Sequence, residues 1–309
     1  MVRHFLGQND LTAGEMEDIF ARTTAMKPVR RSHELEGRSL VMFFEKSSTR
    51  TRLSFEIGMT QLGGHAVYLD RDSSQLSRGE SIEDTARVVS RYADLMMARV
   101  FAHRTIECLA SVAGIPVING LSDEEHPCQS MADLFTILEW KGRLRGVRIA
   151  YVGDGNNNVT HSLMLGAVRM GAHLTIAAPQ SLLPDERYVE RAQASADESG
   201  GSLRITEDAV DAVSEADVVY TDVWVSMGRE DEKQARLDTL APYQVNEQLV
   251  AHARPDYVFM HCLPAHIGEE VTGDVAYGPN SVIFDQAENR LHVQKALMVN
   301  LIQQSEGAA

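Results

Sequence analysis

The sequence lacks the features that mark membrane, secreted and metal-binding proteins. It has no run of about 18 apolar residues, the length that a membrane-spanning helix needs. The start of the chain has no continuous apolar segment of the kind found in signal peptides. Its three cysteines form no CxxC pair and no Cys/His spacing typical of a metal site. We therefore expect reduced thiols, no metal and a cytoplasmic location.

Basic residues are scarce relative to acidic ones. The chain has 29 Lys and Arg against 44 Asp and Glu, which gives a net charge of -15 at pH 7. Nucleic acids and anionic membranes are bound mainly by basic surfaces, so neither is an expected partner. A small anionic substrate is still possible, because a few arginines can bind one locally.

The chain is long enough for two domains, and segments typical of strands and helices alternate along it. Its 309 residues exceed the roughly 250–300 at which a single core stops growing. Strands are predicted at residues 39–45, 66–69, 95–100, 115–119, 147–152, 174–177, 203–206, 218–222, 258–261 and 282–284. Helices are predicted to begin at Thr12 and to cover residues 51–62, 81–92, 104–113, 130–142, 159–170, 185–198, 208–215 and 288–303.

This alternation predicts an α/β fold of two doubly wound domains, each a mostly parallel sheet flanked by helices. We place residues 1–142 in the first domain and residues 143–287 in the second, with a C-terminal helix at 288–309 that packs back on the first. Ligands of open α/β sheets bind beyond the carboxyl ends of the strands. The polar motifs of this chain follow its strands, so we expect an active site in the cleft between the domains.

The most informative motif is the polar stretch at residues 44–52. It lies between an apolar strand-like run and a helix-like run, and it contains four hydroxyl residues and two arginines, Arg50 and Arg52. A helix N-terminus binds anions, and an arginine fork fits phosphate oxygens. Ser and Thr are also ordinary N-cap residues. The density of polar groups favours a binding site for a small phosphorylated substrate.

Three further motifs offer polar groups, and each also has a purely structural explanation. Residues 126–129, His-Pro-Cys-Gln, could donate hydrogen bonds to a polarised carbonyl, or form a loop and a helix cap. Residues 261–264, His-Cys-Leu-Pro, offer a thiol, although most free cysteines are simply buried. Residues 222–228 begin with Asp222 and could hold an amino acid, or form a turn. Judged alone, Gln75, Arg99 and Arg290 are typical of surface positions.

The Gly-rich stretch at residues 153–158 does not predict dinucleotide binding. The third glycine of that fingerprint is replaced by Asn158. An acidic residue about 20 positions later is also missing, because Ala177, Ala178 and Pro179 lie there. A nucleotide-dependent oxidoreductase is therefore disfavoured, and the asparagines could bind a small polar substrate instead.

Together, and in this order, the motifs resemble the aspartate/ornithine carbamoyltransferase family over most of the chain. Residues 48–52 resemble its carbamoyl-phosphate loop, and residues 126–129 its His-Pro-x-Gln element. Asp222 with residues 226–228, and residues 261–264, resemble the elements of members that act on ornithine. An aspartate substrate carries a second carboxylate and would call for an extra cationic residue near Gln75. The negative charge of Asp222 would repel that carboxylate. Acylated ornithine would leave Asp222 without its ammonium partner, and putrescine is a further alternative acceptor.

The resemblance implies transfer of a carbamoyl group from carbamoyl phosphate to the δ-amine of ornithine, giving citrulline, in arginine metabolism. It implies no cofactor, and a homotrimer with sites at subunit interfaces, to which Gln75 of a neighbouring subunit contributes. The implied catalytic residues are Arg50, Arg99, His126 and Cys262. The implied carbamoyl-phosphate contacts are Ser48, Thr49, Arg50, Thr51, Arg52, Gln75, Arg99, His126, Gln129, Cys262, Leu263 and Arg290. The implied ornithine contacts are Asn158, Asp222, Ser226 and Met227, with Asn157 as an alternative to Asn158.

Overall fold

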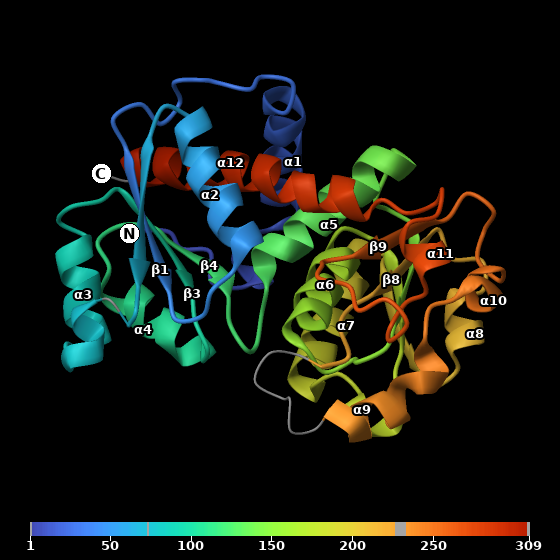
Figure 1. Cartoon of the computed structure of the whole chain (residues 1–309). Helices are drawn as coiled ribbons and strands as arrows, with labels where there is room; N and C mark the ends of the chain where they lie inside the picture. Colours follow the sequence, from blue (N-terminus) through green and yellow to red (C-terminus); the bar gives the residue numbers. More distant parts are fainter. Residues whose placement is uncertain (1, 73, 226–232, 308–309) are drawn as a thin grey trace. The chain divides into compact units, whose positions relative to one another are not determined.

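The chain folds into two compact units. The computed structural model describes residues 2–72, 74–225 and 233–307, so the predicted site residues Ser226 and Met227 lie outside the described residues. Unit 1 comprises Met1–Ala132 and Glu288–Ala309, and unit 2 comprises Asp133–Ala287. Figure 1 labels the elements of both units. Within the described residues, no helix has the length and apolar character needed to cross a membrane.

Unit 1 is built on a parallel sheet with the strand order β2-β1-β3-β4. Its strands are β1 (Ser39–Phe44), β2 (His65–Asp70), β3 (Leu95–Arg99) and β4 (Val117–Leu121). Its helices are η1 (Gln8–Asp10), α1 (Ala13–Met26), α2 (Thr49–Gln61), η2 (Gln75–Arg78), α3 (Ile82–Val89) and α4 (His103–Val112). The strand order reverses between β1 and β3, and ligands of open α/β sheets bind at such a switch point.

Helices cover both sides of the sheet in unit 1. Phe43 of β1 and Met96 of β3 share an apolar cluster with Ile106 and Leu109 of α4. Figure 1 shows α3 and α4 on one side of the strands and α2 on the other. Because Phe44 pairs with Arg99 across the sheet, the segments after β1 and β3 leave it at the same edge.

Unit 2 is built on a parallel sheet with the strand order β7-β6-β5-β8-β9. Its strands are β5 (Arg148–Val152), β6 (His173–Ala177), β7 (Ser202–Thr206), β8 (Val218–Thr221) and β9 (Val258–His261). Its helices are α6 (Asn158–Arg169), η3 (Gln180–Leu182), α7 (Glu186–Ser199), α8 (Ala209–Val213), α9 (Lys233–Leu240), η5 (Ala241–Tyr243), α10 (Glu247–Val250) and α11 (Gly273–Ala276). Here the order reverses between β5 and β8.

Two helices contain residues of both units. Helix α5 (Pro127–Lys141) begins in unit 1 and ends in unit 2, and α12 (Ile283–Gly307) begins in unit 2 and ends in unit 1. Proline at the first position of α5 is favourable, because the first helical N–H groups have no partner inside the helix. In unit 1, Lys295 and Met298 of α12 lie against Gly58 of α2.

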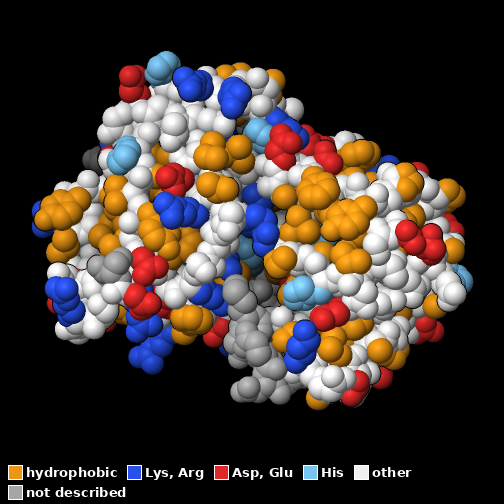
Figure 2. All heavy atoms as spheres, viewed as in Figure 1, with side chains coloured by type: hydrophobic (Ala, Val, Ile, Leu, Met, Phe, Trp, Pro, Cys, Tyr) orange, Lys and Arg blue, Asp and Glu red, His pale blue; other side chains and the backbone are white. Residues whose placement is uncertain are grey.

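The α/β fold with two parallel, helix-flanked sheets is confirmed, as is the capped helix start at Thr12. The strand predicted at residues 282–284 is wrong, because Ile283 begins α12. Its neighbour Ser281 forms only an isolated bridge with Phe259. A short apolar run cannot be assigned to strand or helix by periodicity alone. On the face drawn in Figure 2, acidic and basic side chains are interspersed on each unit.

Candidate active site

In unit 1, the polar motif after β1 forms the N-terminus of α2. Ser48 is the N-cap, and its hydroxyl oxygen accepts a hydrogen bond from the backbone N–H of Thr51 at 3.3 Å. Thr49 and Arg50 occupy the first helical positions. Ser48 therefore acts as an ordinary N-cap, as the structural explanation of the motif predicts. The other N–H groups in the first turn of α2 have no partner inside the helix and can bind an anion, as the binding explanation predicts.

Buried polar groups from three elements meet beside this helix start. Arg290 of α12 donates to Oε1 of Gln129 at 2.7 Å and to Oγ1 of Thr51 at 3.4 Å. The same guanidinium lies 3.5 Å from Nε2 of His126. Thr51, Gln129, His126 and Arg290 are each 5% exposed or less. Residues predicted from three separate parts of the sequence are thus brought together within unit 1.

His126 lies in a strongly cationic environment. Burial lowers its pKa well below the ordinary value of 6.5, and the charges of Arg290, Arg99, Lys46 and Arg50 lower it further. The imidazole is therefore neutral at neutral pH. A neutral imidazole can donate one N–H to a substrate oxygen without adding another positive charge. The surrounding cations are suited to a substrate that carries several negative charges.

Lys46 is a cationic residue of this group that is not among the predicted site residues. Its Nζ lies 5.1 Å from the centre of the Phe101 ring. Burial lowers the pKa of Lys46, and the neighbouring charge of Arg99 lowers it further. The sequence signal was present, because Lys46 belongs to the same polar stretch as Arg50.

Two predicted contacts, Arg52 and Gln75, lie on exposed parts of unit 1. Arg52 forms an i,i+4 ion pair with Glu56 at 3.0 Å, and its guanidinium lies over the Tyr68 ring at 4.3 Å. Gln75 begins the short helix η2 and is exposed.

Cys128 has a different character from the polar residues of its motif. It is fully buried, and its thiol lies 3.4 Å from the carbonyl oxygen of Asn119. Burial raises its pKa to about 12. Because the thiolate is the reactive form, Cys128 is an inert packing residue.

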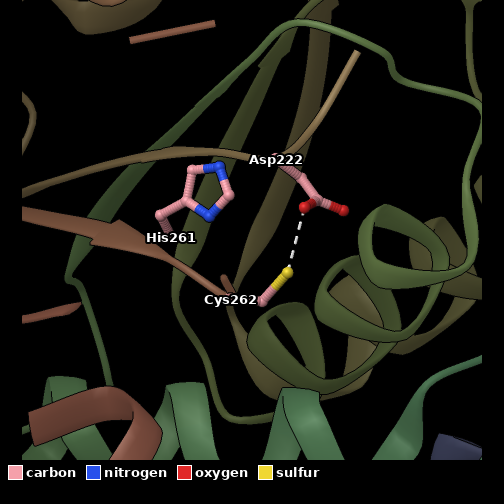
Figure 3. Close-up of side chains that lie close together, drawn as sticks. All are labelled: Asp222, His261 and Cys262. Carbon is pink, nitrogen blue, oxygen red and sulfur yellow. Dashed lines mark hydrogen bonds between the residues drawn. The ribbon is translucent and has the colours of Figure 1, made fainter. Parts of the chain in front are cut away.

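In unit 2, the ends of β8 and β9 bring Asp222 and Cys262 together. Thr221 pairs with His261 in the sheet, so the next residues leave adjacent strands side by side. The Cys262 thiol donates a hydrogen bond to Oδ1 of Asp222 at 3.0 Å (Figure 3). Asp222 is 7% exposed. A buried carboxylate beside a thiol is well suited to binding an ammonium group.

Asp222, His261 and Cys262 are also close enough to share a metal ion. One ligand atom of each lies within 4.8 Å of the others. Figure 3 shows all three side chains, with His261 on the strand and Cys262 just beyond it.

Backbone and side-chain contacts fix the turn that carries Cys262. The backbone N–H of Leu263 donates to Nδ1 of His261 at 2.9 Å. Nδ1 is therefore the acceptor, and the opposite atom Nε2 lies 3.2 Å from Oε1 of Glu270. Both His261 and Glu270 are fully buried. Leu263 has a φ of 61°, a left-handed conformation that a leucine rarely adopts, so these contacts hold a strained turn.

The Gly-rich stretch after β5 caps α6. Asn157 is the N-cap, and its Oδ1 accepts from the N–H of Thr160 at 2.9 Å. Its amide group also donates to the Tyr151 hydroxyl at 3.0 Å and to the Asp154 carbonyl at 2.8 Å. The side chain of Asn157 is thus used to cap the helix, while Asn158 is its first residue.

A buried ion pair between Arg236 and Asp154 supports the same stretch. Arg236 also donates to the carbonyl oxygen of Trp224 at 2.6 Å. These contacts tie helix α9 to the turn before α6 and to the segment after Asp222. Arg236 is not among the predicted residues, because its partners lie far away in the sequence.

Comparison with known families explains this arrangement. Residues 3–139 match the family model described as the carbamoyl-P binding domain of aspartate/ornithine carbamoyltransferase. Residues 145–301 match the model described as its Asp/Orn binding domain. Together the two models cover most of the chain.

Individual relatives agree with the family models. The chain is 55% identical over 300 residues to an ornithine carbamoyltransferase of Thermococcus kodakarensis, covering 96% of this chain and 95% of that protein. It is 54% identical over 300 residues to the anabolic ornithine carbamoyltransferase of Pyrococcus furiosus, with the same coverage. The solved structure of an ornithine carbamoyltransferase from Pyrococcus furiosus matches with a TM-score of 0.93 over 96% of each chain, at 54% identity. The chain belongs to the aspartate/ornithine carbamoyltransferase family.

Proposed function

We propose that this protein is an anabolic ornithine carbamoyltransferase, which makes citrulline and phosphate from carbamoyl phosphate and L-ornithine in arginine biosynthesis. The family match supports carbamoyl transfer, and the relatives named above are ornithine enzymes. The observation that carries the choice of substrate is the hydrogen bond between the half-buried thiol of Cys262 and the buried carboxylate of Asp222. It places an anionic group where an amino acid with two amines would present an ammonium.

In the proposed reaction, unit 1 binds carbamoyl phosphate. The hydroxyls of Ser48, Thr49 and Thr51, the first N–H groups of α2 and the guanidinium of Arg50 hold the phosphate. Arg52 and Gln75 complete this set, with Gln75 supplied by a neighbouring subunit of a cytoplasmic homotrimer. Gln129 accepts from the carbamoyl amine, and Arg290 contacts the carbamoyl group.

The chemical step is attack of the neutral δ-amine on the carbonyl carbon. A C–N bond forms, and negative charge develops on the carbonyl oxygen. Arg50, Arg99 and His126 donate hydrogen bonds to that oxygen, a stabilisation often worth about 3–4 kcal/mol per donor. The C–O bond to phosphate then breaks, the amine loses its extra proton, and phosphate leaves against the arginines. The carbamoyl group arrives activated, so the chemistry requires no cofactor.

Unit 2 orients the amino acid in this proposal. Asp222 binds the α-ammonium, while Asn158, Ser226 and Met227 contact the amino-acid end. Cys262 and the carbonyl of Leu263 face the δ-amine and favour its productive orientation. Direct attack by the amine means that Cys262 forms no covalent intermediate.

The test is a parallel assay of the purified protein with carbamoyl phosphate and four acceptors: ornithine, aspartate, putrescine and N-acetylornithine. We expect product with ornithine only, because aspartate brings a second carboxylate toward Asp222, N-acetylornithine has no α-ammonium to pair with it, and putrescine lacks the carboxylate of an amino acid. Arg50→Ala, expected to fold normally, should lose citrulline formation and serves as the control for contaminating activity. Faster carbamoylation of any other acceptor would refute the substrate assignment.

A further inference from the structure

Three side chains in the segment after the Cys262 turn bring metal-ligand atoms together. Nδ1 of His266 lies 3.6 Å from Oε2 of Glu269 and 3.9 Å from Oε2 of Glu270. One ligand atom of each residue lies within 4.8 Å of the other two. All three residues lie in unit 2, and none takes part in the proposed chemistry.

A tight turn creates this convergence. The backbone N–H of Glu269 donates to the carbonyl of His266 at 2.9 Å, and that of Gly268 donates to the carbonyl of Val271 at 2.8 Å. Gly268 has a φ of 92°, which side chains with a Cβ rarely adopt, and it lets the chain reverse here. His266, Glu269 and Glu270 therefore project from one compact loop.

Glu270 is the residue that most needs a further partner. Its side chain is fully buried, and its Oε1 accepts from Nε2 of His261 and from the backbone N–H of His266. Its Oε2 has no hydrogen-bond donor among the described residues, and the same is true of Oε2 of Glu269. Buried carboxylate oxygens without donors are costly, and each such atom calls for an ion or water.

Only one lysine or arginine among the described residues forms an ion pair with this group. Nζ of Lys233 lies 3.2 Å from Oε1 of Glu269. The two Oε2 atoms are the glutamate oxygens that lie near Nδ1 of His266. A bound cation would offset their charge.

We propose that His266, Glu269 and Glu270 form a binding site for a divalent transition-metal ion of the Zn²⁺ type. One imidazole nitrogen with carboxylate oxygens is a typical Zn²⁺ ligand set. In a tetrahedral site, bonds of about 2.0–2.2 Å place ligand atoms about 3.3–3.6 Å apart, and the His266–glutamate distances of 3.6 and 3.9 Å are close to that spacing. His266 is 45% exposed, so water can reach the ion as a fourth ligand. Through Glu270, the ion stabilises the contact that fixes His261.

The test uses Cys262→Ser as background, because Asp222, His261 and Cys262 form a competing site with a thiol ligand. In this background, Co²⁺ should bind with one ion per chain and give a spectrum without a sulfur-to-metal charge-transfer band. Zn²⁺ should raise the thermal unfolding midpoint in a saturable manner, since a ligand of the folded state stabilises it. Absence of saturable binding would overturn the proposal.

Two histidine variants locate the ion. His266→Gln in the same background should weaken Zn²⁺ binding at least tenfold. The matched control is His33→Gln, which changes an exposed histidine 3.5 Å from Glu36 at the same i,i+3 spacing but without a third ligand. It should leave binding unchanged. Equal affinities of the two variants would place the ion elsewhere and also overturn the proposal.

Discussion

At the scale of single residues, burial decides which groups of the sequence motifs can react. Cys128 and Cys262 each follow a histidine by one or two positions, yet only Cys262 touches a charged partner. Burial raises the pKa of Cys128 to about 12, so its thiol stays protonated. His126 shows the opposite effect of burial, because there the neutral form is the useful one.

The lowered pKa of His126 predicts a specific loss of stability in acid. In the folded protein His126 stays neutral well below pH 6.5, whereas in the unfolded chain it takes up a proton near that value. Falling pH therefore favours unfolding, and the effect is absent above pH 6.5. The expected loss is about 1.4 kcal/mol per pH unit below that value, until the folded-state pKa is reached.

This loss can be measured by urea unfolding at pH 7.5 and pH 5.5, the two values chosen to lie about one unit on either side of the ordinary histidine pKa. The drop in unfolding free energy between them should be smaller by about 1.4 kcal/mol in His126→Gln than in the unchanged protein, because the variant has no imidazole to protonate. Equal drops in both proteins would show that His126 does not resist protonation in the fold.

At the scale of elements, the turn after β9 illustrates how contacts support a reactive side chain from behind. Oε1 of Glu270 accepts from His261 and from the backbone of His266, and His261 in turn accepts from Leu263. Removing the carboxylate leaves buried donors unpaired, at about 1–3 kcal/mol each. Fewer contacts then support the left-handed conformation of Leu263.

Glu270→Ala should therefore raise the KM for ornithine roughly tenfold, an effect of about 1.4 kcal/mol, and leave the KM for carbamoyl phosphate unchanged. Glu270→Gln should restore most of the loss, because the amide oxygen can accept the same two hydrogen bonds. Steady-state kinetics with each substrate varied in turn give both values. Equal rises in the two KM values, or no rescue by glutamine, would show a general folding defect instead.

Strands and helices could be predicted where a local sequence pattern encodes them. Side-chain contacts between residues distant in the sequence could not. The strand that carries Arg99 is a buried apolar run, so it could be assigned from composition. The apolar run near Ile283 was misassigned, since its fate depends on the long helix that follows. Arg290 reaches Gln129 across 161 positions, and Arg236 reaches Asp154 across 82. No single-sequence pattern reports such pairings.

At the scale of the whole molecule, shared helices join the two units through the backbone. The division between the units falls at Ala132 and Asp133, inside the hydrogen-bonded ladder of α5, and α12 also continues from one unit to the other. Separate unfolding of one unit would interrupt both helices. The two units should therefore unfold together.

The positions of the two tryptophans make cooperative unfolding measurable. Trp140 and Trp224 both lie in unit 2, so fluorescence follows that unit alone, whereas far-UV circular dichroism follows both. We expect coincident urea transitions by the two probes, the usual sign of a single cooperative step. Inorganic phosphate, a ligand of the site proposed in unit 1, should raise the fluorescence midpoint of unit 2 as well.

Weakening the shared helix should separate the probes. Ala132→Gly lies at the division inside α5, and Ala167→Gly is the matched control inside α6 of unit 2, with both alanines fully buried. Each costs about 1 kcal/mol of helix stability. Ala132→Gly should move the fluorescence and circular dichroism midpoints apart, whereas Ala167→Gly should lower both by the same amount. Already separate midpoints in the unchanged protein would mean that α5 and α12 do not couple the units.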